Sequence, residues 1–274
     1  MKLIEKLAQL QEAKKAIIAA NFYNLETCKG IMAAAAHLKQ PVILQLTKSS
    51  IDYMGIKPAK KTAEGFIDEF GVEAWLHLDH CKDIELVKKC LDEGFDSIMI
   101  DASDKTFEQN VEITRRVAEL AKSYAVNVEA ELGFVQPPEC SVEPKYFTTP
   151  SEAKQFVSET GVNSLAVAIG SKHGFYKEAA KLDIARLQEI HESTPAFLVL
   201  HGGSGIPDEV LRSAIQHGIC KINIATETKD IFMRCIKELL LHSEEIDLRK
   251  VFPEAIQKVQ NMIEHKLETA ACLN

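Results

Sequence analysis

Three histidines of this chain follow apolar, strand-like runs, and one of them stands directly beside an aspartate. His80 follows Asp79 at the end of such a run, and His173 and His201 close two later runs and are each followed by glycine. Imidazole and carboxylate groups brought to one edge of a sheet can bind zinc and transfer protons. The pair Asp79-His80 alone is equally consistent with a buried salt link, and the two further histidines favour a zinc site.

The rest of the chain alternates short apolar runs with helical patterns. Eight strands are expected at residues 16–22, 41–46, 75–81, 97–101, 126–132, 164–169, 196–201 and 220–225. Helices are expected at residues 1–13, 25–38, 62–70, 84–93, 106–124, 151–159, 183–191 and 207–217, and two more end the chain. This alternation is typical of a parallel sheet with both faces covered, and eight repeats predict a closed barrel. No linker or low-complexity stretch interrupts it, so we expect an α/β fold, a single (β/α)8 TIM-barrel domain over residues 1–274.

The composition limits the classes of molecule that this protein is expected to bind. The 274 residues carry a net charge of -8, which argues against a nucleic acid or an anionic membrane as the main partner and favours a small molecule. The seven cysteines include no CxxC pair, which favours reduced thiols in a cytoplasmic protein. No apolar run is long enough to span a membrane, and the N-terminal segment lacks the apolar core of a signal peptide.

In a barrel of this kind, function lies at the carboxyl ends of the strands. Seven polar residues are expected on that one rim: Asp79, His80, Asp101, Glu131, His173, His201 and Asn223. His77 lies inside its strand and is expected to be a barrel-interior residue. Cys81 directly follows His80 in the strand and therefore faces the opposite side, so we do not expect it to be a fourth ligand.

Five motifs in this order resemble those of the class II, zinc-dependent ketose-phosphate aldolases, the family of fructose- and tagatose-bisphosphate aldolases. They are His77-Leu78-Asp79-His80, Val128-Glu129-Ala130-Glu131-Leu132-Gly133, Ile169-Gly170-Ser171-Lys172-His173-Gly174-Phe175-Tyr176-Lys177, Leu200-His201-Gly202-Gly203-Ser204-Gly205 and Lys221-Ile222-Asn223-Ile224-Ala225-Thr226-Glu227. The resemblance covers nearly the whole chain.

The resemblance implies a catalytic role for the histidine-aspartate group. His80, His173 and His201 would hold one Zn2+ per subunit and leave a position open for substrate. Asp79 would transfer the proton of the aldol hydroxyl. Glu131 matches a glutamate near the metal, which deprotonates the ketose carbon or shelters a displaced zinc. The implied reaction is reversible cleavage of a phosphorylated ketose to dihydroxyacetone phosphate and an aldehyde, through a zinc-stabilised enediolate.

The phosphate is expected where two strand ends lead into helix N-termini, which bind anions readily. The residues concerned are Gly202, Gly203 and Ser204 after the seventh strand, Asn223, Ala225 and Thr226 after the eighth, and, by resemblance, Gly174 and Lys177. The resemblance also implies a monovalent cation, Na+ or K+, on neighbouring carbonyls, and a homo-oligomer, a dimer or a tetramer.

The departures from the family pattern concern the distal end of the substrate. The loop after Gly133 lacks the family's glycine and acidic pairs, and Glu139 or Glu143 would have to supply its glutamate. Residues 253–257 contain no arginine for a distal phosphate. Thr47 and Lys48, at the end of the second strand, are the substitutes predicted here. A fructose- or tagatose-1,6-bisphosphate aldolase proper stays an alternative. A zinc-dependent epimerase or isomerase and a non-catalytic sugar-phosphate sensor are less favoured alternatives.

Overall fold

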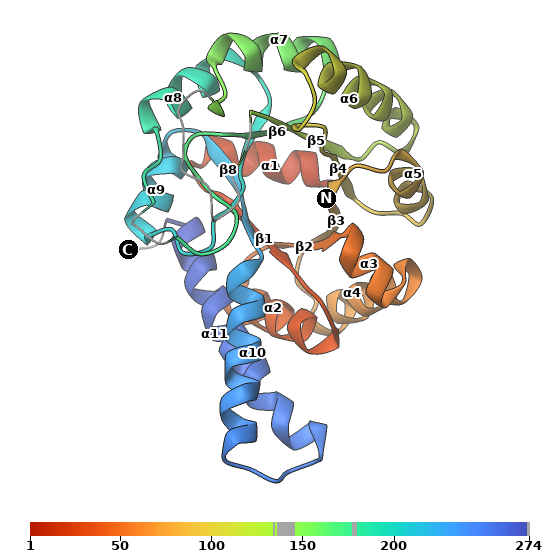
Figure 1. The fold of residues 1–274 in the computed structure, drawn as a ribbon, viewed down its shortest axis with the longest axis vertical. Helices are drawn as coiled ribbons and strands as arrows, with labels where there is room; N and C mark the ends of the chain where they lie inside the picture. The colour runs from red at the N-terminus through yellow and green to blue at the C-terminus, as the bar shows by residue number, and fades with distance from the viewer. Residues whose placement is uncertain (134, 136–145, 177–179, 273–274) are drawn as a thin grey trace.

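The strands of this protein close into a parallel barrel, as the sequence predicts (Figure 1). In the computed structural model, which describes residues 1–133, 135, 146–176 and 180–272, each strand pairs with the next and β8 returns to β1. The strands are β1 (Ile17–Asn21), β2 (Val42–Thr47), β3 (Ala74–Cys81), β4 (Ser97–Ile100), β5 (Asn127–Leu132), β6 (Ser164–Val167), β7 (Phe197–Leu200) and β8 (Ile219–Ile224). Parallel pairing brings all eight carboxyl ends to the same rim.

Helices surround this barrel, and the first of them lies across its amino end (Figure 1). They are α1 (Leu3–Glu12), α2 (Leu25–Leu38), α3 (Lys48–Met54), α4 (Ile56–Phe70), α5 (Ile84–Asp92), α6 (Phe107–Ala121) with the 3-10 turn η1 (Lys122–Tyr124), α7 (Pro150–Thr160), α8 (Ile184–Ser193), α9 (Asp208–Gln216), α10 (Thr226–Leu241) and α11 (Leu248–Ala270). Several begin at side chains that accept a hydrogen bond from a first-turn amide, such as Asn24, Asp83 and Thr106. These caps fix where each helix leaves the rim.

Successive residues of each strand face opposite sides of the barrel wall, and each side contains an apolar layer. One set, such as Ile18, Leu44 and Leu78, packs under the helices. The other set faces the barrel axis, and its layer at the amino ends of the strands is closed by α1, whose leucines join Ile17, Ile43 and Trp75. Since α1 closes that end, the opposite rim is the end that a ligand enters.

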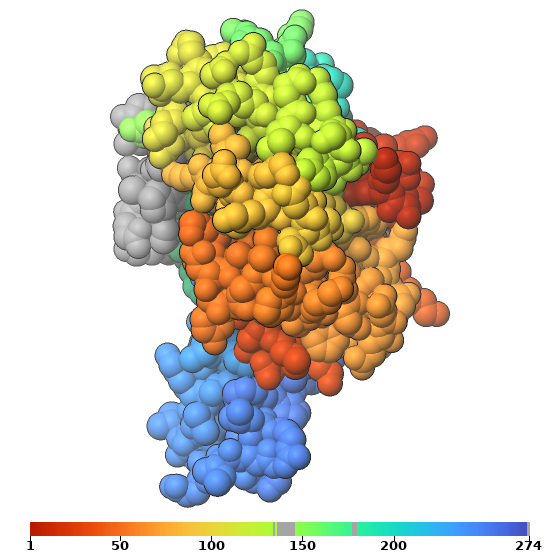
Figure 2. Space-filling view, turned by 90° about the vertical axis from the view of Figure 1, so that its right-hand side faces the viewer, coloured from red at the N-terminus to blue at the C-terminus, as the bar shows by residue number. Residues whose placement is uncertain are grey.

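The last two helices project from the rounded body as an arm (Figures 1 and 2). The base of α11 lies against α2, where Gly30 permits the contact, because a Cβ there would lie 2.9 Å from Cγ1 of Val259. The far end of the arm leaves Leu241 and Ile246 exposed.

The main correction to the predicted elements falls after β2. The sequence predicts a polar segment leading to one helix at residues 62–70, whereas the structure has α3 and α4 in succession. Thr47 caps α3 by accepting from the amide of Ser50, and Gly55, at φ 82, joins the two helices. Across the described part of the chain, no helix has both the length and the apolar composition needed to cross a bilayer.

Candidate active site

A pocket of about 250 Å³ opens at the carboxyl-end rim of the barrel. It is lined by Asn21, Tyr23, Thr47, Ser49, Asp79, His80, His173, Gly174, His201, Gly202, Ser204, Asn223, Ala225, Thr226 and Lys229. Polar groups from segments far apart in the sequence therefore share one wall, as the barrel topology requires.

The three predicted histidines meet in this pocket. The ring centroids of His80 and His201 are 4.5 Å apart, those of His80 and His173 are 5.0 Å apart, and those of His173 and His201 are 6.3 Å apart. One ligand atom from each ring and one carboxylate oxygen of Glu131 lie within 4.8 Å of one another. Nitrogen and oxygen donors at this spacing fit a single zinc ion.

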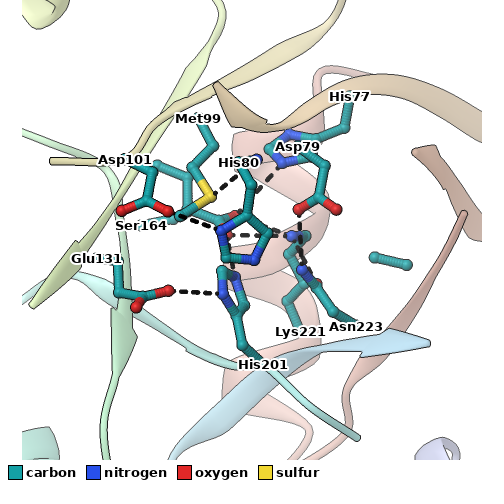
Figure 3. Close-up of polar contacts among 12 residues, drawn as sticks. His77, Asp79, His80, Met99, Asp101, Glu131, Ser164, His201, Lys221 and Asn223 are labelled. Atoms are coloured by element: carbon teal, nitrogen blue, oxygen red, sulfur yellow. Dashed lines mark hydrogen bonds and ion pairs between the residues drawn. The ribbon is translucent and has the colours of Figure 1, made fainter. Parts of the chain in front are cut away.

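An unusual backbone conformation brings His80 to this cluster. Strand alternation alone would direct its ring away from the Asp79 side chain. His80 instead has a φ of 47, and the β3–β4 register shifts between Leu78 and Cys81. Its backbone N–H meets Sδ of Met99 at 3.4 Å, and its Nδ1 lies 2.9 Å from Oδ2 of Asp101. Figure 3 shows the ring held between Asp101 and the ring of His201.

His201 lies between two buried carboxylates. Its Nδ1 is 2.9 Å from Oε2 of Glu131, and its Nε2 is 2.9 Å from Oε1 of Glu129. The other oxygen of Glu129 lies 2.9 Å from Nζ of Lys221, which is fully buried. Glu129 thus has two positively charged partners in a region from which water is excluded, which offsets the desolvation of its charge.

Asp79 is held by two side-chain amides, one on each oxygen. Nδ2 of Asn21 donates to Oδ2 at 2.9 Å, and Nδ2 of Asn223 donates to Oδ1 at 3.2 Å. The two amides are oriented in turn, since Gln45 donates to Oδ1 of Asn21 and Lys221 donates to Oδ1 of Asn223. The carboxylate therefore has one fixed orientation at the pocket wall.

Burial and charge set the protonation of these groups. Burial lowers the pKa of His173 to about 4, helped by the charges of His80 and His201. Burial opposes ionisation of Asp79, but the positive charges of His80 and His201 hold its pKa below the usual value. Burial also opposes the charge on His201, yet hydrogen bonds to Glu129 and Glu131 raise its pKa to about 10. Near pH 7, Asp79 is a carboxylate, His173 a neutral donor and His201 an imidazolium.

The profile of the family described as class II fructose-bisphosphate aldolase matches residues 1–274. The chain belongs to this family. A class II aldolase is a carbon–carbon lyase, and the family is zinc-dependent in general, in agreement with the histidine cluster of this aldolase.

Two curated relatives have the same family name. A fructose-bisphosphate aldolase from Geobacillus stearothermophilus is 40% identical over 260 residues, covering 92% of this chain and 91% of the relative. One from Staphylococcus epidermidis is 36% identical over 269 residues, covering 96% of this chain and 94% of the relative. These alignments span nearly the full length of both relatives.

Solved structures show the same fold. The YdjI aldolase from Escherichia coli K12 matches with a TM-score of 0.88 at 28% identity, covering 98% of this chain and 96% of that one. A fructose-bisphosphate aldolase from Campylobacter jejuni matches with a TM-score of 0.84 at 22% identity, over 99% of this chain and 95% of that one, which supports the fold alone. The predicted TIM barrel of this aldolase is confirmed.

Most of the predicted phosphate-site residues line the pocket: Gly174, Gly202, Ser204, Asn223, Ala225 and Thr226. The structure differs from the prediction at Gly203. Its N–H donates to the carbonyl of Asn223 at 3.1 Å, so this amide is not free to bind an anion. A Cβ on Gly203 would lie 2.7 Å from Cγ2 of Ile222, so the absence of a side chain permits close packing here. Lys177 lies outside the described residues.

The predicted distal anchor is the second correction. Thr47 lines the pocket, but Lys48 does not. Lys48 is the first residue of α3, and its Nζ lies 2.6 Å from Oδ2 of Asp52, one turn along the helix. Helix geometry therefore turns this lysine toward solvent instead of over the rim. The loop positions Glu139 and Glu143 lie outside the described residues.

The sequence did not lead us to predict the polar residues deeper in the barrel that orient the side chains of the site. Glu129 and Lys221 are fully buried, and Asn21 and Gln45 orient Asp79. The signal was present, because Glu129 and Lys221 each stand two positions before a predicted site residue and therefore face the same side of their strands. A polar residue at an inward position deep in a barrel strand needs a polar partner.

Gly202 is expected to tolerate no side chain. Its φ is 68, and a Cβ would lie 2.0 Å from the carbonyl oxygen of Lys172, next to His173. Gly202→Ala should displace the His173 segment and lower zinc affinity and turnover together, as measured by metal titration and steady-state kinetics. Gly161→Ala is the matched control, since Gly161 has a φ of 70 with nothing within 4 Å of a Cβ. Equal effects of the two changes would show that backbone strain alone is responsible.

Proposed function

We propose that this aldolase reversibly cleaves a phosphorylated ketose to dihydroxyacetone phosphate and an aldehyde. The observation that carries the proposal is a fixed, ionised Asp79 in the same pocket as a cluster of three imidazoles. Such a pocket joins a proton acceptor to a metal-binding group within the reach of one small substrate. The names of the two curated relatives support fructose 1,6-bisphosphate as the first ketose to test.

His80, His173 and His201 are the proposed ligands of one catalytic zinc ion, with Glu131 as a fourth group within reach. When bound, zinc supplies a Lewis acid that polarises the ketose carbonyl. Hydrogen bonds to a ligand's second nitrogen fix its tautomer. His80 would donate from Nδ1 to Asp101, and His201 would donate from Nε2 to Glu129. The remaining nitrogen of each ring is then the metal donor.

Asp79 is the proposed base in cleavage and acid in condensation. The carboxylate accepts the proton of the aldol hydroxyl as the carbon–carbon bond breaks, and returns it in the reverse direction. The amides of Asn21 and Asn223 hold its two oxygens, and the adjacent positive charges keep it ionised until the proton arrives. Glu131 is the second proposed catalytic carboxylate.

The proposed phosphate site combines Gly202 and Ser204 with the N-terminus of α10 at Thr226. Backbone amides at a helix N-terminus favour an anion, and small residues permit its close approach. Gly174, Asn223 and Ala225 complete this part of the pocket. The monovalent cation, Na+ or K+, belongs to the same proposal, and turnover compared in potassium, sodium and choline chloride tests it.

The decisive experiment is product analysis of the zinc-loaded protein with a panel of ketose 1-phosphates. An aldolase releases dihydroxyacetone phosphate and an aldehyde in equal amounts. An epimerase or isomerase would instead yield a new ketose or aldose phosphate of unchanged mass, and a sensor would bind substrate without turnover. Either result would reject the proposal.

Zinc uptake by the metal-free protein is expected to strengthen as pH rises. A ligand nitrogen must be unprotonated, whereas a pKa of about 10 keeps His201 protonated near neutrality. Burial opposes the charge on His80, but other groups, chiefly the charged Asp79, raise its pKa as well. Each bound ion must therefore displace at least one proton, and the affinity should rise by at least about tenfold per pH unit between roughly pH 6 and 8. Competition with a chromophoric chelator, corrected for the chelator's own titration, measures this slope. An affinity independent of pH would contradict the assignment of His201.

We also propose that the protein is a homo-oligomer, a dimer or a tetramer. The arm exposes Leu240, Leu241, Ile246 and Leu248, whose exposed fractions range from 52% to 92%. Apolar groups gathered on a projecting segment favour a protein partner. Sedimentation velocity should show the double variant Leu241→Lys, Ile246→Lys dissociated, and Tyr53→Lys, an exposed position on α3, unchanged. A double variant of unchanged mass would place the interface elsewhere.

A cytoplasmic location is the proposal most consistent with the cysteines. Six of the seven, all those in the described part of the chain, are free thiols, and five of these are buried. Reduced thiols persist in the cytoplasm, where disulfides are rare. The substrate class is a small-molecule sugar phosphate, and neither a nucleic acid nor a membrane is proposed as a partner.

A further inference from the structure

A buried lysine of α11 forms an ion pair with a carboxylate at the start of α10, the helix beside it (Figure 1). Nζ of Lys266 lies 3.2 Å from Oε1 of Glu227, and the side chains of the two residues are 7% and 16% exposed. Across the described residues, no other carboxylate lies within ion-pair distance of this ammonium group. A buried charge needs a partner, so Glu227 is the group that permits a lysine at this place.

Glu227 also holds the loop after β7. Its Oε1 accepts a hydrogen bond from the N–H of Gly205 at 2.8 Å, and its own N–H donates to Oγ of Ser204 at 3.3 Å. Because Oγ of Ser204 is the acceptor in the second bond, its own hydrogen is left for a ligand. Ser204 lines the pocket, whereas Glu227 and Lys266 do not. The loop that contributes Ser204 to the proposed phosphate site is therefore tied to α10 by Glu227.

The charge of Glu227 is a disadvantage for a phosphate site. Thr226, the residue before it, lines the pocket at the N-terminus of α10, where an anion is favoured. A carboxylate on the first turn of the same helix repels an anion bound there. Oε2 of Glu227 is buried and has no hydrogen-bond partner among the described residues, so Lys266 is the group that compensates this charge.

We propose that Lys266 is a positioning residue for phosphate binding. It neutralises Glu227 and keeps that carboxylate on the amide of Gly205. The loop at residues 202–205 therefore presents Ser204 to the pocket without an uncompensated negative charge behind it. The proposal rests on the phosphate site of the aldolase function proposed above, and Lys266 acts through Glu227 instead of lining the pocket.

The test measures the binding of dihydroxyacetone phosphate to the zinc-loaded protein by isothermal titration calorimetry. Lys266→Met keeps the apolar stem of the side chain and removes its charge. The Kd should rise by at least about tenfold, the order of one uncompensated charge within about 10 Å of an anion in a partly buried site. In steady-state cleavage, KM for the ketose should rise while kcat changes by less than about threefold, because the interaction affects substrate binding and not the chemical step.

Substitution of the partner separates the effect of charge from a loss of structure. In the double variant Lys266→Met, Glu227→Gln, the glutamine still offers Oε1 to the amide of Gly205 and no charge remains. Its Kd should return to within about threefold of the wild-type value. Glu227→Gln alone should bind at least as tightly as the wild type, because it removes the repulsion and leaves the ammonium group. Both expectations hold even if Lys266→Met does not fold.

His265→Ala is the matched control. His265 is next to Lys266 on α11 and pairs at 2.8 Å with Asp208, the first residue of α9, and 59% of its side chain is exposed. Its removal should leave the Kd within about twofold of the wild-type value, as expected for an exposed pair.

Four results would overturn the inference and leave the aldolase function standing. They are an unchanged Kd in Lys266→Met, a double variant as weak as Lys266→Met, weaker binding in Glu227→Gln, and an equal loss in His265→Ala, which would assign the effect to the packing of α11. A wild-type protein that does not bind dihydroxyacetone phosphate would overturn both the inference and the proposed function.

Discussion

His173→Ala is expected to yield a folded protein that has lost its zinc and its activity. Of the three proposed ligands, His173 is the most suitable to remove, because burial lowers its pKa to about 4 and the neutral ring leaves no buried charge without a partner when it is deleted. Two histidines would remain, and Glu131 would have to give up its hydrogen bond to His201 to replace the lost nitrogen donor. Elemental analysis should find zinc near background, and cleavage should fall to the limit of detection.

His201, another of the proposed ligands, is less suitable for this test. Removal of His201 takes away the hydrogen-bond partner of Glu129 and Glu131, both buried, and breaking one side of a buried ion pair costs about 3 to 5 kcal/mol. Loss of activity in His201→Ala would therefore mix unfolding with metal loss. His37→Ala is the matched control, since His37 pairs with Glu264 on the outside of the protein. A His173→Ala protein with full zinc content would remove this residue from the metal site.

Asp79→Asn is expected to keep zinc and to lose carbon–carbon cleavage. An amide has nearly the shape of the carboxylate, but its single oxygen can replace only one of the two carboxylate oxygens that accept from Asn21 and Asn223, and it cannot accept the proton of the aldol hydroxyl. General acid/base groups typically contribute about 10² to 10⁴-fold, so kcat should fall within that range. Asp79→Ala should lose as much, with an added cost in stability from the two amides left without a partner.

A second measurement shows which proton Asp79 moves. If it serves the aldol hydroxyl alone, exchange of the carbon-bound proton of dihydroxyacetone phosphate with deuterated water should persist in Asp79→Asn while cleavage is lost. Loss of both would assign Asp79 to the ketose carbon as well. A variant that cleaves within about twofold of the wild-type rate would exclude Asp79 from general acid/base catalysis, which is worth far more.

Buried charges in the barrel connect the residues of the site, so a substitution at one of them also affects the others. Glu129 bonds to Lys221 and His201, and Lys221 also orients Asn223, which holds Asp79. The proposed base and a proposed metal ligand are therefore joined through Asn223 and the two fully buried side chains, Lys221 and Glu129. Substitutions at Glu129 or Lys221 should disturb both groups together.

The sequence alone determined the fold and the membership of the reactive cluster. Eight apolar runs separated by helical patterns admit few arrangements other than a closed parallel barrel, because each strand must bury both faces. Parallel strands in a barrel share one rim, so histidines at the ends of three strands had to be neighbours. Local order along the chain was enough for these conclusions.

Only the tertiary structure decided how individual side chains are oriented. Alternation alone would separate the ring of His80 from Asp79, and a left-handed φ of 47, fixed by contacts with Met99 and Asp101, turns it into the site. Lys48 was predicted to reach over the rim, but α3 begins there and pairs it with Asp52, whereas Lys229 reaches the pocket from a distant helix. The positions of His80 and Lys229 depend on segments remote in sequence, which strand and helix periodicity does not encode. The Lys48–Asp52 pair is local, and it was missed because the sequence did not predict a helix at residues 48–54.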